Sequence, residues 1–109
     1  MAYDEDLAQR IRGSLDQVPG IVEKKMFGGV AFMVQGNMAC GVHKDMLMVR
    51  VGPERYEEMM QLPETKPFDI TGRPMKGWLL VEAGGLENEA DLKDWLSQGV
   101  EFAQSLPPK

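Results

Sequence analysis

The chain contains one cysteine and one histidine, Cys40 and His43, and these two residues are the first candidates for nucleophilic chemistry. A cysteine nucleophile needs a general base within hydrogen-bond reach of its sulfur. If both residues lie on one strand, their spacing places the two side chains on opposite faces of the sheet. No acidic residue is obviously placed to orient the imidazole. The sequence therefore favours a buried thiol and a surface histidine over a catalytic dyad.

A metal site finds no better support in the sequence. Zinc needs three or four ligands, and one cysteine with one histidine leaves the remaining ligands to carboxylates. The adjacent carboxylates Glu57 and Glu58 show no ligand spacing and are typical of a solvated helix face. We therefore predict no catalytic residue, no metal and no cofactor.

Anion binding is a more open possibility, because glycines and cations gather in one short segment. The run Gly72–Gly77 places Arg73 and Lys76 in a tight turn that would present backbone donors to an anion. The alternative is a plain turn with both cations in water. We favour this alternative because Gly and Pro commonly form turns that have no binding role. The Gly28-Gly29 pair lacks the G-x-x-x-x-G-K-[ST] spacing of a phosphate-binding loop.

Charge limits the classes of partner. Lys and Arg number 12 and Asp and Glu number 17, so the formal net charge is −5 at pH 7. This negative charge disfavours binding to the phosphate backbone of a nucleic acid. The last expected helix also carries mainly acidic residues, with Lys93 as its one cation. Nucleic-acid association remains an alternative only through cations that would gather on the sheet side: Lys24, Lys25, Arg50, Arg73 and Lys76.

The chain shows no targeting or membrane segment in its sequence. Its acidic start, Met1–Asp6, lacks the basic and apolar regions of a signal peptide. The apolar run Met46–Val49 falls far short of the ~20 residues that a membrane span needs. One cysteine also forms no internal disulfide. We expect a cytoplasmic protein without a membrane partner.

Hydrophobic periodicity predicts helices at both ends of the chain and strands between them. The expected elements, in chain order, are a helix over Asp4–Gln17, strands over Ile21–Phe27, Val30–Gln35, Met38–His43 and Met46–Val51, a helix over Pro53–Leu62, a loop over Thr65–Gly77, a strand over Trp78–Glu82 and a helix over Asn88–Ser105. Short polar or glycine-rich links predict antiparallel hairpins. Residues 1–109 are thus expected to form one α+β domain of two layers, with an antiparallel meandering sheet, helices on one face and the order α-β-β-β-β-α-β-α.

The methionines indicate where a partner would bind. Along Met46–Val51, the branched residues should face the helices, which leaves Met46, Met48 and Arg50 on the outer face. By the same alternation, Met33 lies on the outer face of the second strand. Two methionine-bearing stripes would form an exposed apolar patch, and such patches mark interaction surfaces. The alternative is that a helix or the loop 65–77 covers this face and the methionines only fill the core.

Four separated runs resemble the TfoX N-terminal domain family: Glu23–Phe32 (EKKMFGGVAF), Gly36–Val42 (GNMACGV), Leu47–Gly52 (LMVRVG) and Pro67–Gly77 (PFDITGRPMKG). The resemblance covers the chain from about residue 7 to residue 102. It implies a small domain with a meandering antiparallel sheet, and it brings no catalytic residues. The family takes its name from a two-domain bacterial regulator of natural competence. A chain of 109 residues has no room for the second domain, so we do not expect the regulator's transcriptional role to transfer.

Three hypotheses for function follow from the sequence. The first is a non-catalytic interaction or regulatory module that forms a homodimer, or binds another protein, through Met33, Met46, Met48 and Arg50 on the sheet. The second is a binder or enzyme for a small anionic ligand, with Arg50, Arg73, Lys76 and Trp78 lining a cleft. The third is a nucleic-acid-associated regulator. On the first hypothesis, Met48→Glu should weaken assembly and leave the fold intact.

Overall fold

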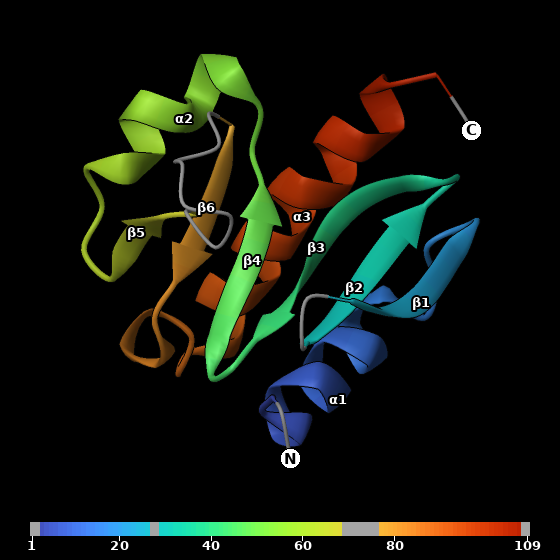
Figure 1. The fold of residues 1–109 in the computed structure, drawn as a ribbon, viewed down its shortest axis with the longest axis horizontal. Helices are drawn as coiled ribbons and strands as arrows, with labels where there is room; N and C mark the ends of the chain where they lie inside the picture. Colours follow the sequence, from blue (N-terminus) through green and yellow to red (C-terminus); the bar gives the residue numbers. More distant parts are fainter. Residues whose placement is uncertain (1–2, 27–28, 69–76, 108–109) are drawn as a thin grey trace.

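The computed structural model describes residues 3–26, 29–68 and 77–107. These residues form three α-helices, α1 (Glu5–Leu15), α2 (Pro53–Met60) and α3 (Glu89–Ser105) (Figure 1). The strands are β1 (Ile21–Met26), β2 (Gly29–Val34), β3 (Asn37–His43), β4 (Met46–Arg50), β5 (Thr65–Pro67) and β6 (Trp78–Val81). A short 3-10 helix, Ala83–Gly85, precedes α3.

All six strands belong to one antiparallel sheet with the order β1-β2-β3-β4-β6-β5. The first four strands form the predicted meander. After β4 the chain passes through α2, forms β5 at the edge, and returns through β6 between β4 and β5. The α+β class, the antiparallel sheet and the two layers are as the sequence predicts.

The strand β5 corrects the predicted order, which treated residues 65–77 as loop throughout. Thr65, Lys66 and Pro67 pair with Val81, Leu80 and Leu79 of β6. A strand of three residues is too short to show an alternating pattern. Pro67 also argues against a strand unless the strand lies at a sheet edge, where β5 does lie.

Side-chain caps begin two of the helices where the sequence places them. The side chain of Asp4 accepts a hydrogen bond of 3.1 Å from the N–H of Leu7 at the start of α1. The side chain of Asn88 accepts one of 2.8 Å from the N–H of Ala90 at the start of α3. Each bond satisfies a backbone donor that helix geometry leaves without a partner.

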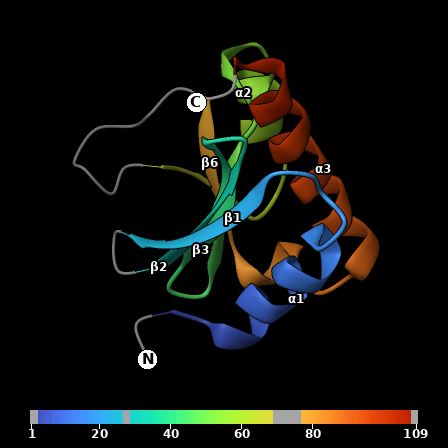
Figure 2. The same ribbon diagram turned by 90° about the vertical axis from the view of Figure 1, so that its right-hand side faces the viewer.

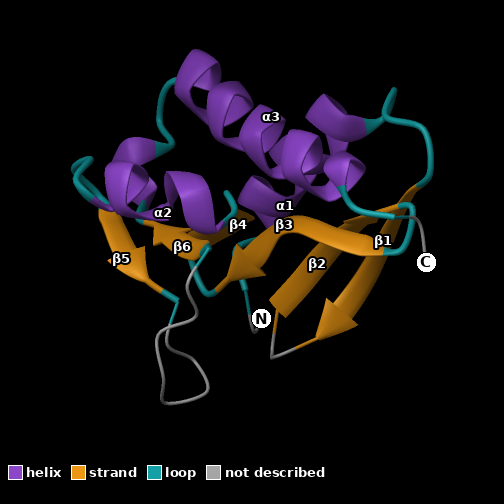
Figure 3. Cartoon of the chain, turned by 90° about the horizontal axis from the view of Figure 1, so that it is seen from above, coloured by secondary structure: helices purple, strands orange, loops and turns teal. Residues whose placement is uncertain are grey.

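The three helices lie on the same side of the sheet, as Figure 2 and Figure 3 show from two directions. The main core fills the space between the two layers. It contains the inward-facing residues predicted from the strand pattern: Val30, Phe32, Leu47, Val49 and Val51. The stiff, branched side chains thus face the helices, and the remaining face of the sheet is covered by none of the described helices.

Candidate interaction surface

The side chains that point away from the helices form the surface that we call the helix-free face. Strand alternation and strand pairing place these residues on it: Val22, Lys24, Met33, Met38, His43, Met46, Met48, Arg50, Lys66, Trp78 and Leu80. The orientation of β1 is fixed by Glu23, whose carboxylate accepts bonds of 2.7 and 2.8 Å from Arg12 of α1. These bonds hold the pKa of Glu23 below its usual value. Because Glu23 faces the helices, Val22 and Lys24 face away from them.

Met48 lies on the predicted face, but the prediction that it is exposed is wrong. Its exposed fraction is 0 %. Phe68, directly after β5, and Leu80 of β6 pack with Met48 in a small buried cluster. Gly41 lies opposite Met48 in the pairing of β3 with β4, and a Cβ atom on Gly41 would lie 2.7 Å from the methionine Cε. Met48 therefore fills the space that Gly41 leaves, and its substitution is a test of the fold instead of a test of assembly.

Several neighbouring apolar side chains of the helix-free face are partly exposed to solvent. Val22, Met33 and Met38 follow one another across β1, β2 and β3, since Val22 pairs with Met33 and Met33 pairs with Met38. Val22 is 50 % exposed, and the side chains of Met33, Met38 and Met46 are partly exposed. The methionine patch predicted from the sequence includes Met33 and Met46 but not Val22 and Met38, which the strand register places beside Met33.

Arg50 lies at the end of the helix-free face between two aromatic rings. Its guanidinium carbon is 5.1 Å from the ring centroid of Trp78 and 5.0 Å from that of Phe102 in α3. Burial lowers the pKa of Arg50 from its usual value. Both distances fall within the range of cation–π attraction, so the rings hold the cation in place. Arg50 and Trp78 are therefore neighbours, whereas Arg73 and Lys76 lie outside the described residues, so the anion cleft formed by all four stays a prediction.

Cys40 and His43 do not form a nucleophile and base. Cys40 is fully buried in the core between the layers, and its burial raises the pKa of the thiol to about 12. His43 pairs with Met46, which places its ring on the other face of the sheet. The thiolate is the reactive form of cysteine, so this thiol is poorly suited to nucleophilic attack. Within residues 3–26, 29–68 and 77–107, no three His, Cys, Asp or Glu side chains are grouped to hold a metal ion.

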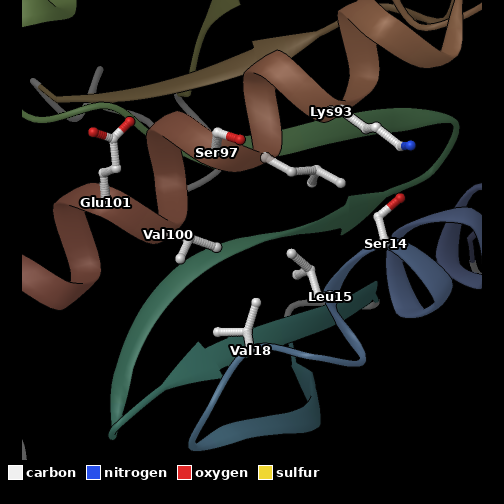
Figure 4. Close-up of a pocket in the computed structure, with 8 residues that line it drawn as sticks. Ser14, Leu15, Val18, Lys93, Ser97, Val100 and Glu101 are labelled. Atoms are coloured by element: carbon white, nitrogen blue, oxygen red, sulfur yellow. The ribbon is translucent and has the colours of Figure 1, made fainter.

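A groove of about 510 Å³ separates α1 from α3 on the helix layer (Figure 4). Leu15, Val18 and Val100 form much of its apolar lining. Its two charged groups, Lys93 and Glu101, are eight residues apart on α3, or about 12 Å at the rise of an α-helix. Polar groups that lie so far apart do not converge on one small ligand.

The matched family model supplies the identification. The TfoX N-terminal domain matches residues 14–103, which is most of the chain. The chain belongs to the TfoX N-terminal domain family. Neither a curated protein nor a solved structure matches it.

Two of the runs that resemble the TfoX N-terminal domain family correspond to adjacent strands of the sheet. Gly36–Val42 supplies most of β3 with Met38 and Gly41, and Leu47–Gly52 supplies most of β4 with Met48 and Arg50. These two runs therefore supply three side chains of the helix-free face, Met38, Met48 and Arg50. Among the described helices of this TfoX N-terminal domain, none has the length and apolar character needed to span a bilayer.

Proposed function

We propose that this protein is a non-catalytic interaction module that self-associates through the helix-free face of its sheet. The observation that carries the proposal is the row Val22–Met33–Met38, an apolar row that is partly exposed on a face without a described helix. Methionine side chains are flexible and adapt to a facing surface, so such a row suits a protein interface. The match to a family named for a competence regulator supports a regulatory role.

The distribution of charge on this face favours a second copy of the chain as the partner. Each copy carries a net charge of −5, so two copies repel one another unless they meet where acidic groups are few. The centre of the helix-free face is apolar, with Lys24 at the β1 end and an ion pair between Lys66 and Glu82 at the β5 end. Two copies that meet through this apolar centre therefore oppose few acidic groups, and a two-fold dimer through the same face of each copy is the commonest symmetric solution.

Val22→Glu tests this proposal because Val22 projects from the face without being part of the core. We expect the association constant of Val22→Glu, measured by sedimentation equilibrium, to fall at least about tenfold, since a charge would be buried without a partner in the dimer. Leu62→Glu is the matched control, because Leu62 is 45 % exposed and lies just beyond α2 on the other layer. The control should associate like the wild type.

At concentrations low enough for the wild type to be monomeric, thermal unfolding of both variants should match the wild type, because each substituted side chain is about half exposed. Equal association constants for Val22→Glu and Leu62→Glu would contradict the proposal. A wild-type protein that is monomeric at every concentration tested would contradict it as well.

A further inference from the structure

The strand β1 ends the sheet on the side opposite β5 and forms an open edge, which faces the viewer in Figure 2. Just before β1, the N–H of Gln35 donates to the carbonyl oxygen of Gly20 at 3.1 Å, and this pair continues the register of β1 with β2. In an antiparallel pair, every second residue bonds to the neighbouring strand, and the backbone groups of the residues between point the other way. The N–H and C=O groups of Ile21, Glu23 and Lys25 therefore face the open edge.

The two edges of the sheet differ in what they offer to a further strand. A peptide that adds to a sheet edge gains its affinity from a row of main-chain hydrogen bonds. β1 has six residues, whereas β5 at the other edge has three and includes Pro67, which has no N–H to donate. Of the two edge strands, β1 is therefore the better template for an added strand.

The charge of the β1 edge is opposite in sign to that of the whole chain. The chain has a net charge of −5, yet β1 carries two exposed lysines, Lys24 and Lys25, and one acidic residue. That acidic residue, Glu23, already forms an ion pair with Arg12. Pairing with β1 of a second copy is disfavoured, because the same two cations would approach from both sides. An acidic strand, in contrast, is attracted by both lysines.

A small recess beside the edge suits an apolar side chain. It has a volume of about 180 Å³ and lies where α1 meets the first half of β1, with an apolar lining from Leu15, Ile21 and Phe32. Glu23 of the edge strand also lines it. Residues directly opposite one another in an antiparallel pair have Cβ atoms about 4.5–5.5 Å apart, so a side chain opposite Glu23 reaches the recess. On the other face, Val22 is 50 % exposed and offers a second apolar contact.

We propose that the edge of β1 binds an extended peptide, with acidic residues followed by apolar residues, as an added antiparallel strand. The acidic side chains lie opposite Lys25 and Lys24. The apolar side chains lie opposite residues 21–23, and one of them enters the recess between α1 and β1. The peptide backbone bonds to the N–H and C=O groups that face the open edge. The centre of the helix-free face stays uncovered, so this binding and the self-association proposed above are tested separately.

A peptide with the sequence SEELVIS, acetylated at its N-terminus and amidated at its C-terminus, is the probe. As an antiparallel strand, it sets its two glutamates opposite Lys25 and Lys24 and its leucine opposite Glu23. The protein is used at a concentration at which it is monomeric. We expect a saturating amount of the peptide to slow amide hydrogen exchange of Ile21, Glu23 and Lys25 at least about tenfold, because these N–H groups gain partners. Unchanged exchange at these three amides would overturn the proposal.

Two N-methylated forms of the peptide separate strand addition from simple charge attraction. The N–H of the leucine points toward β1, so its methylation removes a hydrogen bond and obstructs the approach of the two strands. We expect the affinity to fall at least about tenfold. The N–H of the valine points away from β1, so the peptide methylated there is the matched control and should bind like the parent peptide. Equal affinities of the two methylated peptides would overturn the proposal.

Variants of the protein test the role of the two lysines. Lys24→Gln combined with Lys25→Gln should reduce the affinity for the peptide at least about threefold, the effect of two lost surface ion pairs. The melting temperature should stay unchanged, because both side chains are exposed. Arg55→Gln combined with Lys93→Gln removes two exposed cations of α2 and α3 and is the matched control, which should bind like the wild type. Equal affinities of the two double variants for the peptide would overturn the proposal.

Discussion

Met48→Glu is expected to remove about 4 kcal/mol or more of the free energy of unfolding, which is a large part of the roughly 5–15 kcal/mol that stabilises a typical domain. The substituted side chain has no exposed surface and packs with Phe68 and Leu80. A glutamate there is either ionised in an apolar cluster or neutralised at the cost of several pKa units, at about 1.4 kcal/mol each. Urea denaturation followed by circular dichroism measures the loss.

Met48→Leu is the matched control for this prediction. It keeps the apolar character and most of the volume of the side chain, so the expected cost is below about 1.5 kcal/mol. A Met48→Glu protein that unfolds at the wild-type urea concentration would show that the side chain is accessible to water. That result would restore Met48 as a residue of the exposed patch.

Gly99→Ala is expected to destabilise the protein by about 1–3 kcal/mol, although alanine is the better helix former. In the middle of a helix, replacing glycine by alanine contributes about 1 kcal/mol of stability. At Gly99, however, the added Cβ would overlap the carbonyl oxygen of Ala39 in β3 and lie 3.2 Å from a methyl group of Val49. The Cβ atom belongs to the backbone of α3 and the carbonyl oxygen to the backbone of β3, so neither atom can move without its whole element. The helix α3 must therefore shift away from the sheet. The packing loss therefore exceeds the gain in helix propensity.

Gly13→Ala in α1 provides the control with the opposite sign. A Cβ atom on Gly13 would have no atom within 4 Å, so only helix propensity changes. We expect this variant to gain about 0.5 kcal/mol, somewhat less than a mid-helix position because Gly13 lies near the end of α1. Thermal unfolding of the two glycine variants shows whether each substitution lowers or raises the free energy of unfolding. Stabilisation by Gly99→Ala would show that α3 does not lie directly on β3.

Local patterns in the sequence were sufficient to predict the layers of the fold. The alternation in Met46–Val51 correctly places Leu47 and Val49 toward the helices, and the short link at Lys44-Asp45 correctly predicts the β3–β4 hairpin. That hairpin register also sets Gly41 opposite Met48. The space beside a glycine is therefore a sequence feature that points to burial of Met48.

The burial of Met48 also depends on contacts between segments far apart in the chain. Phe68 reaches Met48 because β5 pairs at the sheet edge, and a three-residue strand with a proline is too short for periodicity to reveal. The burial of Gln98 in α3 could not be predicted for a related reason. A polar residue in an amphipathic helix normally indicates the solvated face, and its burial follows only from where α2 begins relative to α3.

Methyl NMR of the methionines, recorded across a wide range of protein concentration, tests the central claim of self-association most directly. If two copies meet at the helix-free face, the methyl signals of Met33, Met38 and Met46 shift as the concentration rises. Met59 and Met60 of α2 pack against the core on the other layer and should keep constant positions. Constant signals from Met33, Met38 and Met46, or shifts confined to Met59 and Met60, would contradict self-association through this face.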